Sequence, residues 1–293
     1  MAKSIYLIGY PLKHSVSREF QQAALDYHRL DIRYEVRETR EEELSQVVGG
    51  LREPRNLGAN VTLPYKEKVL SLLDETDDFA RMVGAVNTIV NRGGRLTGYN
   101  TDAPGFLRAL SDAGFQPAGK GVVILGAGGA ARAVSFALIR EGVAWLAVFN
   151  RTKSRAEYLA KALTGYGRGK GLVTEVAALP WEEDALRRLV GRCQLVVNCT
   201  TLGMRHSPQE GQSPLAEDMI GEGVLICDLV YNPRETPLLS IARRRGAKTI
   251  DGLPMLVYQG AIAFKLWTGK DPPLEIMFKT AEKALMEEGG QFS

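Results

Sequence analysis

Gly121-Val122-Val123-Ile124-Leu125-Gly126-Ala127-Gly128-Gly129-Ala130-Ala131-Arg132 is the stretch that decides the fold of this chain. Its apolar run, residues 122–125, predicts a short strand buried on both faces, as in parallel sheets. Gly126 and Gly128 permit positive φ angles and a close approach of a ligand, and the small Ala131 lets the following helix pack tightly on the strand. A strand, a glycine turn and a helix N-terminus in this order predict a binding site for a pyrophosphate.

Alone, this pattern also fits a strand-to-helix turn that binds nothing, and the next strand distinguishes the two interpretations. Residues 145–149 form a second apolar run, which ends in Asn150-Arg151-Thr152-Lys153-Ser154-Arg155. A domain that binds NAD usually carries an acidic residue at this point for the ribose 2′-hydroxyl. This chain has basic side chains and a threonine hydroxyl there, and guanidinium groups pair bidentately with phosphate. The segment therefore predicts NADP(H), with a solvated basic turn as the alternative.

The composition is that of an ordinary globular enzyme. The 293 residues suffice for two domains, and the hydrophobic fraction of 45% and the charged fraction of 24% are typical. The 37 basic and 34 acidic residues leave a net charge of +3, too small to predict binding to nucleic acid. No stretch has the length of a membrane span and the N-terminus has no long apolar run, so no membrane association is expected.

Cysteine and histidine are too sparse to predict a disulfide framework or a metal site. The three cysteines are an odd number, typical of the reducing cytoplasm, where we expect this protein. No spacing of cysteines and histidines resembles a zinc site, so no metal is expected. These residues are Cys193, Cys199, Cys227, His14, His28 and His206.

The order of the predicted elements indicates an α/β protein with two domains. In the first hundred residues, strands alternate with helices and end in a hairpin about Arg92-Gly93-Gly94, which predicts a mixed sheet. These strands are expected near 4–9, 32–36, 58–62, 85–91 and 95–98. After Pro117, alternation with short links predicts a doubly wound parallel sheet of the Rossmann type. Its strands are expected near 122–125, 145–149, 172–176, 194–199, 224–228 and 249–250.

Some polar residues of the first domain fit either a structural or a functional role. Ser15 and Ser17 lie at or near the N-terminus of a helix expected from about residue 18. They would either cap this helix or, with its N-terminus, bind a substrate carboxylate, and the local sequence leaves both open. Pro64 suits the first turn of a new helix, from which Lys66 would project. A lone lysine in such a place is typically a solvated surface residue.

Later segments offer further candidates. Thr101 and Asp102 precede a helix that either of them would cap. Gln259 shares a helical face with two apolar residues, so it is either a surface residue or a ligand contact. Ligands of parallel sheets bind beyond the C-terminal ends of the strands, which makes residues 198–204 and 228–233 candidates for cofactor contacts.

Seven motifs follow one another along the chain. They are Ser15-Val16-Ser17 after His14, Asn60-Val61-Thr62-Leu63-Pro64-Tyr65-Lys66, Gly84-Ala85-Val86-Asn87-Thr88, Gly98-Tyr99-Asn100-Thr101-Asp102, Gly126-Ala127-Gly128-Gly129-Ala130, Asn150-Arg151-Thr152, and Asp251-Gly252 with Met255-Leu256-Val257-Tyr258-Gln259. In this order they resemble the shikimate dehydrogenase family over essentially the whole sequence.

The resemblance implies a reaction and a domain plan. The reaction is the reversible, NADPH-dependent reduction of 3-dehydroshikimate to shikimate in the aromatic amino-acid (chorismate) pathway. The plan is a substrate-binding catalytic domain of residues 1–104 with 253–293, and an NADP-binding Rossmann domain of residues 105–252. The active site would lie in the cleft between them.

The resemblance also implies roles for individual residues. Lys66, paired with Asp102, resembles the acid/base group. The substrate-binding positions are Ser15 and Ser17 for the carboxylate, Thr62, Lys66, Asn87, Asp102 and Gln259 for the ring, and Tyr231 to help close over the substrate. The cofactor-binding positions are Gly126, Ala127, Gly128, Gly129, Ala130, Asn150, Arg151, Thr152, Lys153 and Arg155, with Thr200, Leu229, Gly252 and Met255 nearer the nicotinamide.

The chain departs from the family pattern at two positions. Arg18 stands where proline often follows the second serine, and we expect it to alter the charge at the carboxylate end. Pro254 stands where glycine often precedes the methionine, and we expect it to stiffen a loop near the nicotinamide. Neither replaces a reacting group.

Two other functions compete with this interpretation. A quinate/shikimate dehydrogenase that uses NAD or NADP is the first, and an acidic residue after the second strand would favour it. A regulatory protein that binds a nucleotide on the same fold is the second, and the presence of both Lys66 and Asp102 argues against it. A monomer and a homodimer are both compatible with the sequence.

Replacing Arg151 with alanine is expected to weaken the binding of NADP far more than that of NAD. Loss of one charge-assisted contact to a phosphate typically costs about 1.5–3 kcal/mol, and NAD has no 2′-phosphate to lose such a contact. Titration of the purified variant with each cofactor measures the two dissociation constants. Equal weakening of both would contradict the assignment of this segment to the 2′-phosphate.

Overall fold

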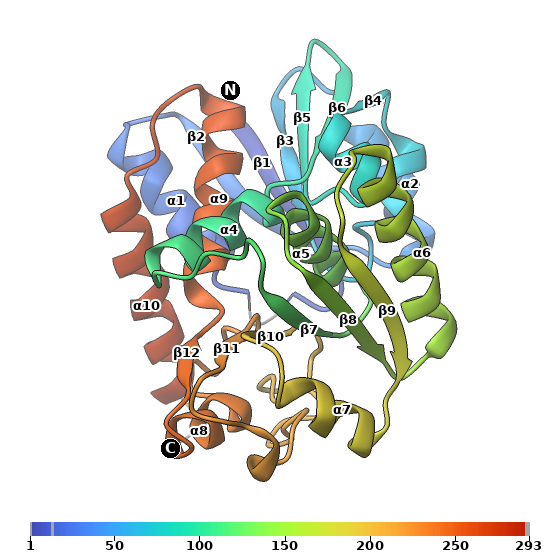
Figure 1. The fold of residues 1–293 in the computed structure, drawn as a ribbon. Coiled ribbons are helices and arrows are strands. Elements are labelled where there is room, and N and C mark those ends of the chain that lie inside the picture. Colours follow the sequence, from blue (N-terminus) through green and yellow to red (C-terminus); the bar gives the residue numbers. More distant parts are fainter. Residues whose placement is uncertain (1, 13–14, 291–293) are drawn as a thin grey trace. The chain divides into compact units, whose positions relative to one another are not determined.

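The computed structural model describes residues 2–12 and 15–290, and the chain divides into two compact units (Figure 1). The first unit contains Met1–Gly105 and Leu256–Ser293, and the second contains Phe106–Met255. In the described part of the chain, each unit is built on one six-stranded sheet. His14, which precedes the first serine motif, lies outside the described residues.

The sheet of the first unit is mixed, as the sequence predicts. Its strands are β1 (Lys3–Gly9), β2 (Ile32–Glu38), β3 (Asn56–Val61), β4 (Glu75–Thr76), β5 (Thr88–Arg92) and β6 (Arg95–Tyr99). Their order is β2-β1-β3-β5-β6-β4; β1 is parallel to β2 and β3, and β5 is antiparallel to β3 and β6. Gly93 and Gly94, with φ of 62° and 88°, form the two-residue turn of the predicted hairpin, which is confirmed.

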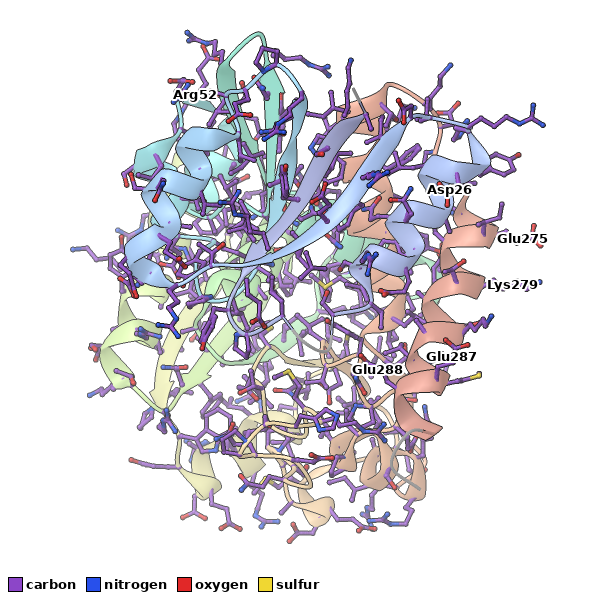
Figure 2. All side chains as sticks on the ribbon, turned by 180° about the vertical axis from the view of Figure 1, so that it is seen from behind. Asp26, Arg52, Glu275, Lys279, Glu287 and Glu288 are labelled. Atoms are coloured by element: carbon purple, nitrogen blue, oxygen red, sulfur yellow. The ribbon has the colours of Figure 1, made fainter. Side chains whose placement is uncertain are left out.

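Helices of the first unit pack on this sheet and on one another. They are α1 (Ser17–Tyr27), α2 (Leu44–Gly50), α3 (Asp78–Val83), α10 (Leu274–Gly290) and the 3₁₀ helices Glu41–Glu43 and Lys68–Leu72. In addition, α4 (Asp102–Asp112) begins in the first unit, and α9 (Leu253–Thr268) ends in it. Val47 and Val48 of α2 share a buried cluster with Ile8 of β1. Figure 2 shows α1 and α10 side by side, with Glu275 and Lys279 on the exposed face of α10.

The segment after β3 is a turn, so the expectation that Lys66 projects from the first turn of a helix was wrong. The Leu63–Pro64 peptide is cis, and the next helical residue is Lys68. The Lys66 carbonyl accepts a hydrogen bond of 2.7 Å from the N–H of Val86, rather than from the residue four positions on in a helix. Proline suits both a first helical turn and a non-helical turn. The hydrogen bond with the distant Val86 therefore decides the local structure at Lys66.

The sheet of the second unit is parallel throughout and has the predicted Rossmann topology. Its strands are β7 (Gly121–Leu125), β8 (Trp145–Asn150), β9 (Glu175–Pro180), β10 (Leu195–Asn198), β11 (Leu225–Asp228) and β12 (Lys248–Ile250). The order is β12-β11-β10-β7-β8-β9, and every neighbouring pair is parallel. The winding therefore reverses between β7 and β10, where such sheets bind their ligands.

The helices of the second unit connect these strands. They are α5 (Gly129–Arg140), α6 (Lys153–Gly169), α7 (Glu183–Val190) and α8 (Pro237–Arg244). The strand expected at 172–176 begins later, at Glu175, because α6 continues beyond Leu163, and Leu159, Leu163 and Gly167 all lie on its buried face. Among the described residues, no helix combines the length and the apolar character needed to cross a membrane.

Replacing Gly58 with alanine is expected to destabilise the first unit by about 2–4 kcal/mol, because strained backbone and overpacking each cost about 1–3 kcal/mol. Gly58 has a φ of 145°, and a Cβ there would overlap the carbonyl oxygen of Ile89 and lie 2.8 Å from Nε1 of Trp267. Urea denaturation measures the free energy of unfolding. Gly49→Ala in α2 is the control; a Cβ there meets nothing within 4 Å. Equal stability of the two variants would contradict the packing described here.

Candidate active site

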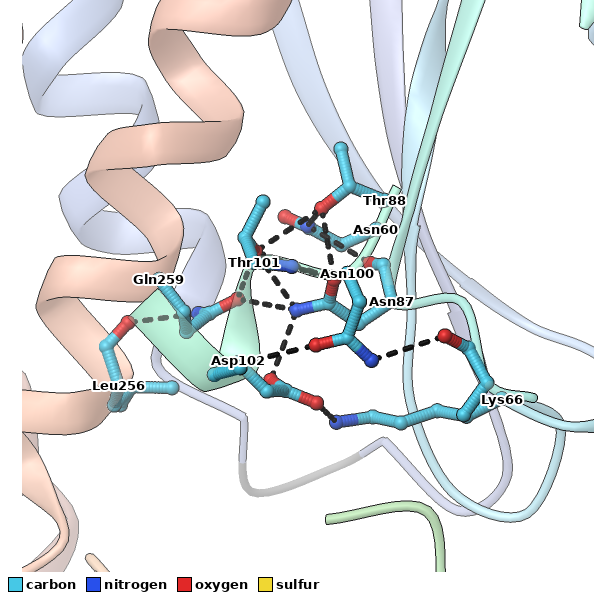
Figure 3. A network of polar contacts seen from close by, with 11 residues as sticks. Asn60, Lys66, Asn87, Thr88, Asn100, Thr101, Asp102, Leu256 and Gln259 are labelled. Atoms are coloured by element: carbon cyan, nitrogen blue, oxygen red, sulfur yellow. Dashed lines mark hydrogen bonds and ion pairs between the residues drawn. The ribbon is translucent and has the colours of Figure 1, made fainter. Parts of the chain in front are cut away.

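Lys66 and Asp102 form a largely buried ion pair in the first unit (Figure 3). Nζ of Lys66 donates to Oδ2 of Asp102 at 2.6 Å, and the two side chains are 14% and 4% exposed. Lys66 comes from the turn after β3, and Asp102 is the first residue of α4. The N–H of Ala103 donates to Oδ1 of Asn100 at 3.3 Å, so Asn100 takes the capping role considered for Thr101 and Asp102.

Asn87 holds the second oxygen of the Asp102 carboxylate. Its Nδ2 donates to Oδ1 of Asp102 at 2.8 Å. Its own Oδ1 accepts the backbone N–H of Thr101 at 2.7 Å. This second bond fixes the amide orientation, because the reversed amide would place an oxygen against the carboxylate and a donor against an N–H. Both oxygens of the buried carboxylate therefore have donors.

Gln259 of α9 belongs to the same network. Its Oε1 accepts from Nδ2 of Asn87 at 3.1 Å, and its Nε2 donates to the Leu256 carbonyl at 2.7 Å. The side chain is half-buried. Of the two roles that the sequence left open for Gln259, a purely solvent-facing one is thus excluded. Lys66, Asn87, Asp102 and Gln259, all singled out from the sequence, are directly connected.

The other predicted substrate residues of the first unit lie outside this network. Ser15 Oγ accepts the N–H of Ser17 at 3.4 Å, and the Ser17 side chain is buried without a hydrogen bond to a described residue. Ser17 shares a face of α1 with Gln21, whose Nε2 donates at 2.9 Å to the carbonyl of Gly260, the neighbour of Gln259 in α9. Thr62 is half-buried at the end of β3. Tyr231 belongs to the second unit.

The glycine turn of the second unit leaves space and free donors at the start of α5. Gly126 has a φ of 110°, and a Cβ there would lie 3.1 Å from the Cys199 carbonyl oxygen. A Cβ on Gly128 would meet nothing within 4 Å, so the backbone is open at this point. Gly128 precedes the first residue of α5 and supplies no side-chain cap, which leaves the first N–H groups of the helix for a ligand, with Ala127 and Ala130 beside them half-buried.

The basic segment after β8 is exposed. Among the described residues, the guanidinium groups of Arg151 and Arg155 have no hydrogen-bond or ion-pair partner. Lys153 differs, because its Nζ lies 3.6 Å from Oε1 of Glu157. Nδ2 of Asn150 donates to the Thr152 carbonyl at 2.9 Å, which shapes the turn. Two exposed guanidinium groups without a partner among the described residues therefore lie in the segment that the sequence assigns to the 2′-phosphate.

The ends of β10 and β11 are held together by a buried carboxylate. Oδ1 of Asp228 accepts from Nδ2 of Asn198 at 2.9 Å and from the N–H of Val230 at 3.0 Å. Its Oδ2 accepts from Oγ1 of Thr236 at 2.7 Å. Burial raises the pKa of Asp228 to about 6, although these three hydrogen bonds act in the opposite direction. The Thr200 hydroxyl donates to Oδ1 of Asn198 at 2.7 Å, so the loop itself uses it.

Of the residues predicted near the nicotinamide, Gly252 and Leu229 are in close contact in the second unit. A Cβ on Gly252 would lie 2.5 Å from the Leu229 carbonyl oxygen, so only glycine permits this approach. Met255 is buried in the first turn of α9. Pro254 lies in the same turn, where a missing N–H costs little, so the expectation that it stiffens a loop was wrong. Arg18 is exposed in the first turn of α1.

Comparison with known proteins identifies the family. Models for the shikimate dehydrogenase substrate binding domain, the shikimate / quinate 5-dehydrogenase and the shikimate 5′-dehydrogenase C-terminal domain match residues 7–89, 109–201 and 252–282. A shikimate dehydrogenase (NADP(+)) from Moorella thermoacetica is 44% identical over 286 residues, which cover 98% of this chain and 95% of that protein. The chain belongs to the shikimate dehydrogenase family.

Solved structures of similar proteins support this family assignment. A shikimate 5-dehydrogenase from Thermus thermophilus, in complex with NADP(H) and shikimate, is 39% identical with a TM-score of 0.84; the match covers 96% of this chain and 99% of that chain. A quinate dehydrogenase from Corynebacterium glutamicum, in complex with NAD, is 30% identical with a TM-score of 0.86; the match covers 96% of this chain and 99% of that chain. This shikimate dehydrogenase family member therefore has structural relatives that differ in substrate and cofactor.

Three buried polar residues of the network were not singled out from the sequence. Nδ2 of Asn60 donates to Oγ1 of Thr88 at 3.1 Å, and Oδ1 of Asn60 accepts from the hydroxyl of Tyr34 at 2.8 Å. The signal that could have found Asn60 is an amide within an otherwise apolar strand, since such a group needs partners. Thr88 and Tyr34 gave no signal, because threonine and tyrosine are ordinary residues of strands.

The buried carboxyl group of Asp228 is expected to make stability depend on pH. Its folded pKa of about 6 lies above the ordinary value, so the folded state binds the proton more tightly. The resulting stabilisation is present below about pH 4 and is lost as the pH rises through 6, on the order of 2–3 kcal/mol. The free energy of unfolding of wild type minus that of Asp228→Asn, from urea denaturation, should fall between pH 4 and pH 7. A difference that stays constant over this range would refute the prediction.

Proposed function

We propose that this chain catalyses the reversible reduction of 3-dehydroshikimate to shikimate with NADPH. The observation that carries the proposal is the buried Lys66–Asp102 pair with Asn87 and Gln259 around it. Such an arrangement holds an ammonium in a fixed direction, as a proton donor to a substrate oxygen requires. Family membership and the relative from Moorella thermoacetica, named an NADP(+) enzyme, supply the substrate and the cofactor.

The residues of the second unit fit NADP(H). The open backbone at Gly128 and the uncapped start of α5 suit the pyrophosphate. Arg151 and Arg155 would bind the 2′-phosphate, with Asn150, Thr152 and Lys153 around it. Lys161→Ala, which removes an exposed positive charge later in α6, is the matched control for a substitution of Arg151. Contacts from Thr200, Leu229, Gly252 and Met255 to the nicotinamide are part of this proposal.

In the proposed mechanism NADPH, when bound, supplies the hydride. Reduction of the ketone leaves negative charge on its oxygen, and Lys66 Nζ donates the proton that neutralises it. Asp102 keeps the ammonium aimed, while Asn87 prevents the carboxylate from turning away. In the reverse direction, neutral Lys66 accepts the proton of the hydroxyl. The protein's other contribution is to position the ring.

Binding of the substrate is assigned to polar side chains of the first unit. Ser15 and Ser17 would hold the carboxylate, and the Ser17 hydroxyl, which has no described hydrogen-bond partner, is consistent with this role. Thr62, Asn87 and Gln259 would hold the ring hydroxyls, and the role of Tyr231 stays a prediction from the family resemblance. The three free cysteines are consistent with a cytoplasmic location. For the oligomeric state, the monomer and the homodimer both remain predictions.

A quinate/shikimate dehydrogenase is the second candidate, because a quinate dehydrogenase in complex with NAD is among the structural relatives. Oxidation of shikimate and of quinate, each with NADP and with NAD, distinguishes the two. We expect the highest kcat/KM for shikimate with NADP. A comparable value for quinate would assign the broader activity, and no oxidation of either compound would refute both.

Lys66→Ala is expected to lower turnover roughly 10²- to 10⁴-fold with little change in KM, as loss of a proton-transfer group requires. Asp102→Asn is also expected to be severe, and the double variant should be far less than additive, because members of one catalytic unit fail together. Steady-state kinetics with shikimate and NADP measure these effects.

The control for this series is Lys68→Ala. Lys68 lies two positions on in the same turn region, and its exposed ammonium pairs with Glu41. This variant should keep normal turnover. Near-normal turnover of Lys66→Ala across pH 6 to 10 would show instead that Lys66 is not the proton donor.

A further inference from the structure

Behind the Asp102 carboxylate, a chain of buried hydrogen bonds runs to the edge strand β2 of the first unit. The Tyr34 hydroxyl donates to Oδ1 of Asn60 at 2.8 Å, and Nδ2 of Asn60 donates to Oγ1 of Thr88 at 3.1 Å. Thr88 Oγ1 donates to Oδ1 of Asn87 at 3.3 Å. Nδ2 of Asn87 donates to Asp102 at 2.8 Å. Figure 3 shows the part of this chain from Asn60 to Asp102. Each group donates to the next, and all five side chains are buried.

We propose that Tyr34 is a positioning residue for the Asp102 carboxylate. The inference rests on the proposed reductase function, in which Asp102 aims the Lys66 ammonium. In a medium of low dielectric constant, hydrogen bonds that point in one direction polarise and strengthen one another. The Tyr34 hydroxyl starts this series, because it donates to Asn60 and accepts no hydrogen bond from Asn60, Thr88, Asn87 or Asp102.

The hydroxyl acts by fixing the amide of Asn60. The only acceptor of this amide is Oδ1, and Tyr34 donates to it. Its Nδ2 donates to the Asn87 carbonyl at 3.2 Å, in addition to the hydrogen bond to Thr88. Asn60 therefore holds both the backbone carbonyl of Asn87 and, through Thr88, its side-chain oxygen. Without the Tyr34 hydroxyl, Oδ1 of Asn60 becomes a buried acceptor without this donor, and the amide loses the contact that sets its orientation, so its Nδ2 no longer holds Thr88 and the Asn87 carbonyl in place.

The ring of Tyr34 is held independently of its hydroxyl. Its centroid lies 6.3 Å from that of Trp267, whose Nε1 donates to the Ile89 carbonyl at 2.9 Å across the space left by Gly58. The backbone N–H of Tyr34 donates to Oε1 of Gln22 at 2.9 Å. Tyr34→Phe should consequently fold and remove the hydroxyl alone.

The chain offers a matched control at the opposite end of β3. The Tyr6 hydroxyl donates to Oδ1 of Asn56 at 3.4 Å, and Nδ2 of Asn56 donates to the carbonyl of Gly50 at 2.8 Å. Tyr6→Phe thus removes a tyrosine hydroxyl from an asparagine of the same strand, without touching the series that leads to Asp102. A general loss of packing or stability would affect both variants.

Kinetics of the full-length variants test the proposal. Tyr34→Phe should lower kcat for shikimate oxidation about 3- to 10-fold, the range expected from one neutral hydrogen bond, and leave the KM for NADP unchanged. Tyr6→Phe should keep the wild-type kcat. In the Asp102→Asn background, Tyr34→Phe should have no further effect on the residual rate. The same fold-loss in both backgrounds, or equal losses in the two tyrosine variants, would overturn the proposal.

A spectroscopic measurement separates this inference from the proposed reaction. In ligand-free protein, the side-chain amide resonances of Asn60 and Asn87 in a ¹⁵N–¹H spectrum should shift in Tyr34→Phe and stay in place in Tyr6→Phe. Unchanged Asn87 resonances in Tyr34→Phe would refute the positioning role whatever the enzyme does. Shifted resonances in a protein that oxidises no shikimate would refute the proposed function and leave the hydrogen-bond series established.

Discussion

A largely buried ammonium and a buried carboxylate must be paired, and this requirement organises the polar part of the first unit. Desolvation costs several kcal/mol for each ion, and the cost is offset only when the pair is close and the remaining hydrogen-bonding capacity is satisfied. Lys66 and Asp102 meet the first condition with a distance of 2.6 Å between Nζ and Oδ2. Asn87 meets the second by donating to the other carboxylate oxygen. The amides and hydroxyls behind Asn87 follow from its own need for partners in an apolar surrounding.

Strand direction explains how residues so far apart in sequence meet. β3 ends where its antiparallel neighbour β5 begins, and β6 ends at the same edge, since Asn60 pairs with Thr88 and Thr88 with Tyr99. Lys66 follows β3, Asn87 precedes β5 and Asp102 follows β6, so all three reach one edge of the sheet. A mixed sheet can thus assemble a site from both the beginnings and the ends of its strands, whereas a parallel sheet uses only the ends.

The sequence predicted the fold but only part of the site. The fold follows from local sequence patterns, whereas the connections within the site depend on strand pairing. The parallel sheet could be predicted, since buried strands, a glycine turn and alternating helices are local patterns. Lys66 and Asp102 could be named from motifs, but their connection through Asn87 depends on strand pairing that no local pattern contains. Pro64 illustrates the limit, because a first helical turn and the observed turn suit proline equally well. Tyr34 could not be found, because an aromatic residue in a strand is usual and its partner lies on another strand.

The two buried carboxyl groups, Asp102 and Asp228, show why environment decides their roles. Within the described part of the chain, Asp228 accepts hydrogen bonds only from neutral donors, and burial raises its pKa to about 6. Its contacts join the ends of β10 and β11 and the start of α8, so its hydrogen bonds stabilise the loops of the second unit. Asp102 has an ammonium as its partner, and that ammonium is itself partly exposed. The proposed chemistry is assigned to Asp102 because its partner is a charged, partly exposed proton carrier, whereas the contacts of Asp228 hold the loops of the second unit.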